Sequence, residues 1–260
     1  MTLSCRICLG EIKSELFSTI VLNRPVKFYD CTHCGYVQTE NPTWLEEAYE
    51  SAINDCDTGI MIRNQMNVGA VLATLLFLKE NNEKVVDCAA GYGILVRLLR
   101  DRGVDALWSD PYCKNLLASG FEYKGEKGLL VTAFEAYEHF MFPAKETENF
   151  FGIAPNILLS TELISEPAPE PGKWWYYGFN HGQHIGFYRL KTLNYIAKKH
   201  NKFLISDGRR YHLFSDQPIN SFFWRTALKI SFLVPNLFAV GRKSKVWEDF
   251  KYLGGTLSSS

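Results

Sequence analysis

The sequence has no excess of charge of either sign, because its 28 Lys and Arg residues balance its 28 Asp and Glu residues. A chain without net positive charge has no general attraction to polyanions. The balance therefore argues against DNA or bulk RNA as a partner, although a local basic patch stays possible.

Long apolar runs are also missing. The residues after Met1 are polar and include cysteine, without the apolar core of a secretory signal. The most apolar region, 219–240, is interrupted by Arg225, Lys229 and Pro235, so it lacks the span of a membrane helix. We expect a cytoplasmic protein without a transmembrane segment. Region 219–240 is then core, or less readily a surface that touches a membrane-bound partner.

The 260 residues, 47% of them apolar, are enough for one α/β domain with a small appendage. Four of the seven cysteines form two CxxC pairs, Cys5 with Cys8 and Cys31 with Cys34, separated by strand-like stretches at 16–22 and 26–29. This is the spacing of a zinc ribbon, and disulfides are a poorer explanation in a reducing cytoplasm. Four thiolates close the coordination sphere, so the predicted zinc is structural.

Residues 84–100 read as a strand, a tight Ala/Gly turn and a helix. Val85 and Val86 are β-branched, whereas Ile94, Leu95 and Leu98 recur at helical spacing. A nucleotide-like ligand can approach the backbone across such a turn, because the residues there lack bulky side chains.

This turn, Asp87-Cys-Ala-Ala-Gly-Tyr-Gly93, resembles motif I of class I S-adenosylmethionine-dependent methyltransferases. The resemblance implies a Rossmann-like, doubly wound, mostly parallel sheet with S-adenosylmethionine across Ala89, Gly91 and Gly93. Asp87 matches the acid that helps to hold the methionine end of the cofactor. Asp110 ends the next predicted strand and matches the acid that binds the ribose.

The sequence Ser-Asp-Pro-Tyr around Asp110 also looks like the Asp-Pro-Pro-Tyr motif of methyltransferases that act on nucleic acid bases. That motif follows the fourth strand, whereas this one follows the second, so we interpret it as the ribose-binding turn.

Further strands are predicted at 129–134 and 156–161. In the class I fold the first of these looks like the fourth strand, whose carboxyl end faces cofactor and substrate, which implicates Phe134 and Glu135 in cofactor binding. Glu138 and His139 follow and are catalytic candidates. The glutamates could equally be there because the first turn of a helix favours acids.

Two helices are predicted before the motif. One begins with Thr43 as N-cap and Glu46 as its capping-box partner, and the other covers 60–79. This segment resembles the part that closes over the cofactor in related methyltransferases. Tyr49 and Arg63 are candidates to meet the methionine carboxylate or the substrate.

Residues 165–182 hold three prolines and the run Trp174-Trp-Tyr-Tyr, which predicts either a substrate lid or an aromatic seal. His181 and His184 follow in a Gly-rich loop. A helix at 190–200 and last strands at 203–206 and 238–240 complete the pattern.

With the cysteine pairs, the motif, the Phe-Glu-x-x-Glu-His turn and His-Ile-Gly-Phe-Tyr in this order, the chain resembles sugar C-methyltransferases and related enzymes of polysaccharide and antibiotic pathways. The resemblance places His184 on their catalytic histidine. Gln183 stands where they have a glutamate, and their C-terminal domain has no counterpart. We expect His184 to be the general base, with His181 or His139 as substitutes.

The predicted organisation is a zinc ribbon at 1–42, a helical lead segment at 43–82, the methyltransferase domain at 83–253 and a disordered tail at 254–260. The expected acceptor is a small, sugar-like molecule. An RNA or protein methyltransferase and a non-catalytic S-adenosylmethionine-binding protein remain alternatives. The sequence leaves open the identity of the acceptor, the atom methylated and the oligomeric state.

Overall fold

The structure is a computed structural model that describes residues 3–12, 14–49, 57–78 and 84–255. The chain divides into two compact units. The first contains residues 1–53, 134–152 and 158–218, and the second contains 54–133, 153–157 and 219–260. The cysteine pairs therefore belong to the same unit as the predicted catalytic histidines.

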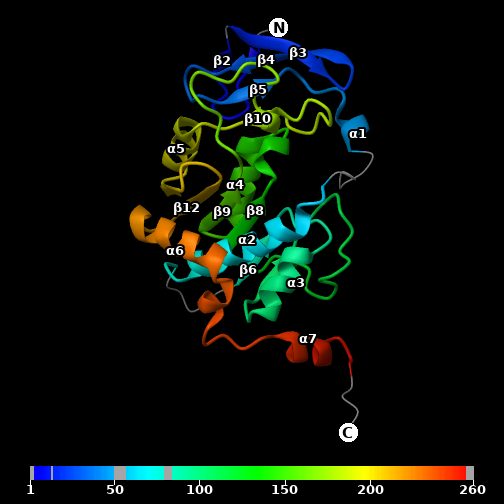
Figure 1. Ribbon diagram of the computed structural model, residues 1–260, viewed down its shortest axis with the longest axis vertical. Helices are drawn as coiled ribbons and strands as arrows, with labels where there is room; N and C mark the ends of the chain where they lie inside the picture. The colour runs from blue at the N-terminus through cyan, green and yellow to red at the C-terminus, as the bar shows by residue number, and fades with distance from the viewer. Residues whose placement is uncertain (1–2, 13, 50–56, 79–83, 256–260) are drawn as a thin grey trace. The chain divides into compact units, whose positions relative to one another are not determined.

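An antiparallel four-stranded sheet, ordered β10-β5-β4-β3, forms around the predicted ribbon. Its strands are β3 (Glu15–Val21), β4 (Arg24–Asp30), β5 (Val37–Thr39) and β10 (Gly186–Phe187). The β3–β4 hairpin confirms the two predicted strands, and a two-stranded ladder of β1 (Leu3–Ser4) and β2 (Glu11–Ile12) precedes it. Strand β10 comes from far along the chain and pairs with β5, as the labels in Figure 1 show.

The central sheet has six strands in the order β11-β12-β9-β8-β6-β7. They are β6 (Val85–Asp87), β7 (Ala106–Trp108), β8 (Leu130–Phe134), β9 (Asn156–Ser160), β11 (Phe203–Ser206) and β12 (Tyr211–Ser215). Strand β6 runs parallel to β7 and β8, with Val85 opposite Ala106 and Leu130, whereas β11 and β12 are antiparallel. Val85 and Val86 are fully buried, as a strand covered on both faces requires. The α/β fold with a mostly parallel sheet is confirmed.

The helices are α1 (Leu45–Ala48), α2 (Ile60–Leu75), α3 (Ile94–Asp101), α4 (Pro143–Ile153), α5 (Leu190–Lys199), α6 (Ser221–Leu233) and α7 (Val246–Tyr252), with 3-10 turns η1 (Tyr137–His139), η2 (Trp175–Tyr177) and η3 (Pro235–Ala239). Helices α2, α3 and α5 were predicted. Helix α2 ends at Leu75, earlier than the predicted end at Lys79, which itself lies outside the described residues. The tail beyond residue 255 lies outside them as well.

Two local predictions are wrong. Thr43 is not the N-cap of the first helix: α1 follows Trp44 without a side-chain cap. The buried Trp44 indole donates to the Gly182 carbonyl at 2.8 Å, so tertiary packing sets this helix start. Residues 238–240 form no strand, because Pro235 begins the turn η3, and the predicted last strand is replaced by β12.

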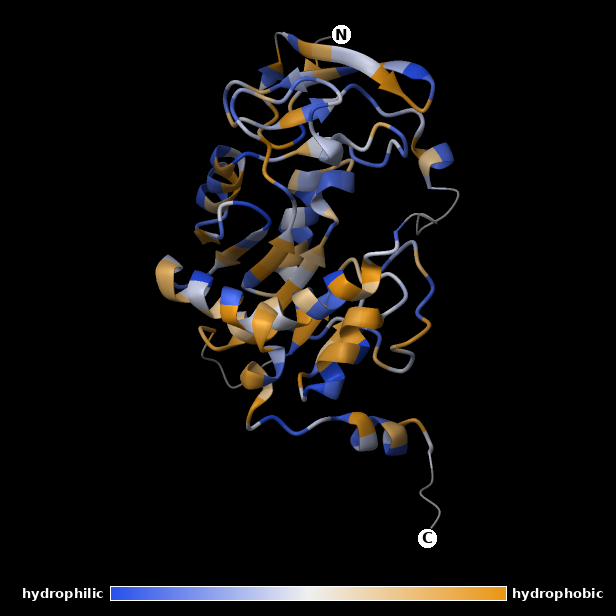
Figure 2. Cartoon of the chain, viewed as in Figure 1, coloured by the Kyte–Doolittle hydropathy of each residue, from blue (hydrophilic) through white to orange (hydrophobic). Residues whose placement is uncertain are grey.

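The apolar region 219–240 is only partly core. Helix α6 buries Trp224 and Leu228 but exposes several large side chains, among them Phe222, Phe223 and Leu233. Its mixed, largely apolar colouring is visible in Figure 2. Among the described residues, no helix is long and apolar enough to cross a membrane. The sequence predicted this region as core and not as a helix, and its apolar composition could not show how much of its surface would be covered.

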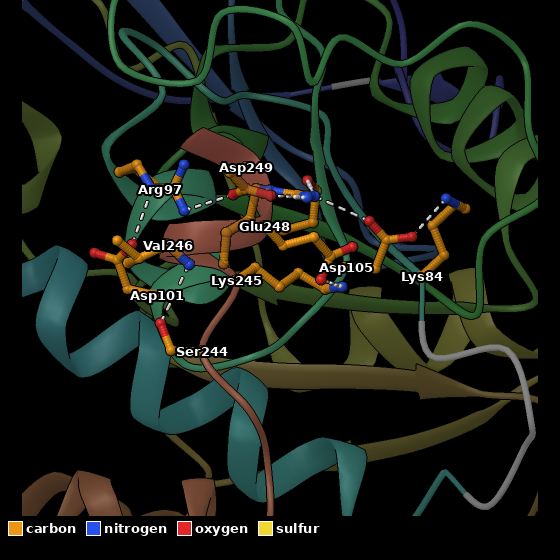
Figure 3. Close-up of polar contacts among 11 residues, drawn as sticks. Lys84, Arg97, Asp101, Asp105, Ser244, Lys245, Val246, Glu248 and Asp249 are labelled. Carbon is orange, nitrogen blue, oxygen red and sulfur yellow. Dashed lines mark hydrogen bonds and ion pairs between the residues drawn. The ribbon is translucent and has the colours of Figure 1, made fainter. Parts of the chain in front are cut away.

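A buried ion-pair network joins α7 to α3 in the second unit (Figure 3). Arg100 donates to both carboxylate oxygens of Asp249, at 2.7 and 2.8 Å, and also to Asp105 at 2.9 Å. Arg97 donates to Asp249 as well, at 2.7 Å. The Arg100 guanidinium also lies over the Phe121 ring, 3.7 Å from its centroid. Asp249 is 2% exposed, so its charge depends on these two arginines.

Replacing Asp249 with Ala should lower the free energy of unfolding by about 3–5 kcal/mol, because it leaves the buried Arg100 with only the more exposed Asp105 as a charged partner. Burial raises the pKa of Asp249, but hydrogen bonds from Arg100 and Arg97 outweigh it and hold that pKa below its usual value. The stabilisation is therefore complete at pH 7 and is lost only as the pH falls through the lowered pKa. Urea unfolding at pH 7 measures the effect. Asp101→Ala, which removes a more exposed partner of Arg97, is the control and should cost under about 1 kcal/mol; equal losses would contradict the prediction.

Candidate functional site

The predicted cofactor turn has the backbone that its glycines permit. Gly91 and Gly93 have φ of 51° and 88°, in the left-handed region that side chains disfavour. A Cβ on Gly93 would lie 3.0 Å from the Ala118 side chain, whereas one on Gly91 would have no described atom within 4 Å. Gly93 is thus required by packing. Gly91 borders open space, which suits the close approach of a ligand to the backbone.

Two acids flank this turn in the second unit. Asp87 ends β6 and lies opposite Trp108 of β7. Asp110 follows β7, and its Oδ2 accepts the Gly91 N–H at 2.9 Å while its Oδ1 accepts the N–H groups of Tyr112 and Cys113. Asp110 thus lies in the turn after β7, where the sequence placed it, and its ribose-binding role stays a prediction. Tyr112 of the same turn is 93% exposed. Each Asp110 oxygen keeps acceptor capacity for a ligand hydroxyl.

Asp87 is a buried acid, 3% exposed. Burial raises its pKa to about 7, and the nearby charge of Asp110 also raises it, against the Thr132 hydroxyl that donates to Asp87 Oδ1 at 2.8 Å. A cation beside Asp87 would lower this raised pKa, because it would stabilise the ionised carboxylate.

The other predicted cofactor residues have protein partners. The Glu135 carboxylate accepts the Ser160 hydroxyl at 2.7 Å, and Glu135 has φ of 50°. The Phe134 ring meets Tyr211 edge to face. Arg63 donates to both oxygens of Asp57, so it forms an ion pair within the second unit. These contacts orient the side chains but do not test their predicted roles.

Glu138, His139 and His184 meet in the first unit. One potential ligand atom of each residue lies within 4.8 Å of the others. The His139 and His184 rings are 4.9 Å apart between centroids, and His139 Nε2 is 4.0 Å from Glu138 Oε1. Glu138 and His139 come from η1, which begins three residues after the end of β8, whereas His184 lies two residues before the start of β10. The sequence predicted these three as catalytic candidates, and the structure brings them together.

The hydrogen bonds of the two rings define their tautomers. His184 Nδ1 lies 2.6 Å from the Tyr176 carbonyl oxygen, and His139 Nδ1 lies 3.1 Å from the Gln183 carbonyl oxygen. A carbonyl oxygen only accepts, so each Nδ1 carries the hydrogen and each Nε2 presents a lone pair. Burial lowers the pKa of His139 to about 4 and that of His184 well below its usual value, which keeps both rings neutral near pH 7.

Glu138 is fully buried. Its Oε1 accepts the Tyr176 hydroxyl at 2.6 Å, whereas its Oε2 has no hydrogen-bond partner among the described residues. Burial raises the Glu138 pKa to about 8, and the neighbouring Glu135 adds to the rise. Sequence reasoning placed Tyr176 only in an aromatic run, because nothing in that run marks which hydroxyl faces a carboxylate.

His181 and Gln183 have different surroundings. The His181 ring packs against His184 at 4.8 Å, and its Nδ1 accepts the Gln183 N–H at 3.2 Å, which leaves the hydrogen on Nε2. Gln183 donates its side-chain amide to the Ala48 carbonyl at 2.7 Å. The Tyr49 hydroxyl oxygen lies 2.8 Å from His139 Nδ1 and shares the hydrogen of that nitrogen with the Gln183 carbonyl, so this predicted candidate reaches the cluster. His181 thus offers no lone pair on Nε2.

The four paired cysteines gather in the first unit. Their sulfur atoms all lie within 4.8 Å of one another, with Cys5 to Cys34 and Cys8 to Cys31 at 3.5 Å, and none forms a disulfide. Thiolates around a tetrahedral zinc ion with bonds of about 2.3 Å are about 3.8 Å apart. The donor set and spacing therefore fit one zinc ion.

Both cysteine pairs are tied to the segment that carries His184. Arg6, between Cys5 and Cys8, donates to the Ile185 carbonyl at 3.1 Å and to Thr39 and Glu40 carbonyls. Arg189 forms a two-bond ion pair with Asp30 and donates to the Gly35 carbonyl, next to Cys31 and Cys34. A Cβ on Gly186 would lie 1.8 Å from the Tyr36 hydroxyl, so this position of the strand needs glycine.

The aromatic segment mainly packs this unit. Tyr176 and Tyr177 are 1% exposed and join a core with Val26, Phe28 and Phe187. Of the two readings of this run, an aromatic seal and a substrate lid, burial favours the seal for these tyrosines. Trp175 differs, because it is 69% exposed on the same turn.

The profile of the methyltransferase domain family matches residues 63–202. No curated protein matches the chain. Solved structures with similarity include a 1,6-didemethyltoxoflavin-N1-methyltransferase of Burkholderia thailandensis, at 14% identity and a TM-score of 0.47 over 75% of this chain and 96% of that one. A magnesium protoporphyrin IX methyltransferase of Synechocystis PCC 6803 has 15% identity and a TM-score of 0.43 over 66% and 93%.

The match covers more than half of the chain, and it includes the motif turn, the glutamate–histidine turn and His184. The protein therefore belongs to the methyltransferase domain family, of the S-adenosylmethionine-dependent class I type. The expectation of a methyltransferase is confirmed.

Replacing Arg189 with Met should loosen the His184 segment, because it removes the ion pair with Asp30 and the bond to Gly35. We expect a loss of about 2–4 kcal/mol in stability and faster hydrogen exchange at the Ile185 amide, which donates to the Glu138 carbonyl. Lys191→Met is the matched control, since Lys191 reaches the same cysteine knuckle only through an exposed bond to the Thr32 carbonyl. Unchanged exchange at Ile185 in Arg189→Met would refute the link.

Proposed function

We propose that the protein transfers the methyl group of S-adenosylmethionine to a small, hydroxyl-bearing acceptor, a sugar or sugar nucleotide of a polysaccharide or secondary-metabolite pathway. Family membership supports the cofactor. The observation that carries the acceptor chemistry is the pair of imidazole lone pairs beside a buried carboxylate in the first unit. We also propose a cytoplasmic location and the domain boundaries expected from the sequence, with the zinc ribbon at 1–42, the lead segment at 43–82 and the methyltransferase domain at 83–253.

In this proposal Asp87 meets the ammonium of the methionine end, Gly91 and Gly93 line the turn, and Asp110 accepts the ribose hydroxyls. The raised pKa of Asp87 supports its part, because a cationic ammonium would stabilise the ionised carboxylate. Arg63, Phe134 and Glu135 remain proposed cofactor contacts.

Cofactor affinity should fall as the pH drops below 7, by up to about tenfold per pH unit, because Asp87 must lose a proton to receive the ammonium. Calorimetry between pH 5.5 and 7 measures this slope. Asp87→Asn should bind weakly without the slope. Asp110→Ala should bind about ten- to a hundredfold more weakly near pH 7 and show its fall in affinity at a lower pH, because the Asp110 charge helps to raise the Asp87 pKa. A flat profile for the natural protein would remove Asp87 from the ammonium.

For proton removal we propose the cluster of Glu138, His139 and His184, with His184 as the first candidate base. Its Nε2 lone pair can accept the hydrogen of an acceptor hydroxyl while its Nδ1–H stays on the Tyr176 carbonyl. His139 has the same tautomer and is the second candidate. His181 ranks below both, because its Nδ1 accepts a backbone N–H.

The exposed Trp175 supports a sugar-like acceptor. Its ring is 5.2 Å from that of Tyr176, which in turn contacts His184. An exposed indole provides a flat face for the apolar side of a sugar ring, although aromatic acceptors would also stack there.

His184→Ala should lower turnover about 10²–10⁴-fold on a verified acceptor while leaving cofactor affinity unchanged, because a base acts in the transition state. A panel of sugar nucleotides with radiolabelled S-adenosylmethionine would identify the acceptor. Gln183→Ala is the control and should cost less, since an amide accepts no proton at neutral pH. Near-normal turnover in His184→Ala would move the role to His139 or His181.

We propose that Cys5, Cys8, Cys31 and Cys34 hold a structural zinc ion. With four thiolates it has no open position, so its work is to fix the two knuckles that Arg6 and Arg189 connect to the His184 segment.

Purified protein should contain about one zinc per chain by metal analysis, and Cys31→Ser should lose most of it. The control is Cys113→Ser, which alters a thiol outside the cluster and should keep the metal. Zinc removal should also raise exchange at Ile185, because the knuckles anchor its neighbours. Well under half an equivalent of zinc in the natural protein would exclude this site.

A further inference from the structure

Glu138 is the starting point, because a fully buried carboxylate should not leave one oxygen bare. Its Oε2 has no hydrogen-bond partner among the described residues, although Oε1 accepts the Tyr176 hydroxyl. A buried polar atom without a partner is costly, and such atoms mark functional sites or missing ions. We infer that Glu138, His139 and His184 together bind a divalent cation, at a site distinct from the four cysteines.

The imidazole tautomers suit metal binding. Metal-bound histidines usually donate their second ring N–H to a carbonyl or a carboxylate, which orients the ring and exposes the other nitrogen. His184 donates from Nδ1 to the Tyr176 carbonyl and His139 from Nδ1 to the Gln183 carbonyl. Two Nε2 lone pairs therefore accompany the unpaired Glu138 oxygen. Among the described contacts, no Lys or Arg side chain donates a hydrogen bond to Glu138 that would neutralise its charge.

The spacing is near that of a filled site. One ligand atom from each residue lies within 4.8 Å of the other two. Ligands on a cation with bonds of about 2.1 Å are about 3 Å apart when adjacent and about 4.2 Å apart when opposite. Side-chain shifts of about 1–1.5 Å would close the three ligands around the ion. Entry is open on the histidine side, since the His139 side chain is 22% exposed.

Two imidazoles and one carboxylate favour a first-row transition-metal ion such as Mn²⁺ over Ca²⁺, and three protein ligands leave positions open for other oxygens. The role of the cation rests on the proposed function: the open positions take oxygens of the acceptor, and the cation lowers the pKa of the bound hydroxyl. One Nε2 lone pair serves one partner. With the cation bound, His184 Nε2 would be a metal ligand instead of the base, and the acceptor hydroxyl, made more acidic by the cation, would lose its proton to water.

Mn²⁺ binding tests the site without acceptor or cofactor. Protein with its zinc content verified is titrated with Mn²⁺, and unbound Mn²⁺ is followed by electron paramagnetic resonance. Thiolate sites disfavour Mn²⁺, so the cysteine cluster should not contribute. We expect one bound equivalent, with at least a tenfold weaker dissociation constant in Glu138→Gln and in His184→Ala. Tyr176→Phe, which frees Glu138 Oε1, should weaken binding to a smaller extent, because Tyr176 is a positioning residue.

His181→Asn is the matched control. It removes a neighbouring ring that offers no Nε2 lone pair, and an Asn oxygen can still accept the Gln183 N–H. This variant should bind Mn²⁺ as the natural protein does. Zinc content and melting temperature show whether each variant is folded. Absence of a stoichiometric Mn²⁺ site in the folded protein would overturn the inference, as would equal binding by Glu138→Gln. Loss of methyl transfer with Mn²⁺ binding intact would instead count against the proposed function.

Discussion

Antiparallel pairing of β5 with β10 is the interaction on which the first unit depends. Gly186 lies opposite Gln38 and Phe187 opposite Val37, so the residues after His184 become the edge strand of the N-terminal sheet. The Ile185 N–H then donates to the Glu138 carbonyl, and the Ile185 carbonyl accepts from Thr39 and Arg6. A chain segment shared by two hydrogen-bonding neighbours has little freedom to move. Hydrogen bonds therefore hold the histidine loop and the cysteine knuckles together.

This arrangement gives the proposed zinc ion a role, although its cysteines are far from the motif turn in sequence. Arg189 reaches the second knuckle and Arg6 connects the first knuckle to Ile185. The backbone carbonyls of Tyr176 and Gln183 orient the two imidazoles. The knuckles can fix these carbonyls only if the loop between Tyr176 and Gln183 is held at both ends.

Much of the fold could be predicted from sequence because it rests on local signals. The strand β6, the turn after it and helix α3 were predicted from the β-branched residues at 85–86, the glycines and the helical spacing that follows. The two CxxC pairs predicted the cysteine cluster. The failures have tertiary causes. Trp44 sets a helix start by bonding to Gly182, and the exposed face of α6 depends on what covers it.

The site divides in the same way. Residue types and spacing pointed to Glu138, His139 and His184, yet nothing in the sequence showed which ring nitrogen carries its hydrogen or that Tyr176 faces Glu138. Those facts decide the chemistry.

Burial raises the pKa of a carboxyl group unless a positive charge lies beside it. Two such acids occur here, Asp87 with a pKa raised to about 7 and Glu138 with a pKa raised to about 8. Arg100 and Asp249 show the alternative, in which the chain supplies the opposite charge itself and the acid's pKa stays low. A structural acid is thus satisfied within the protein, whereas an acid left without a cationic partner is prepared for one that arrives from outside. We propose that this partner is the ammonium of the cofactor for Asp87, and a metal ion shared with two histidines for Glu138.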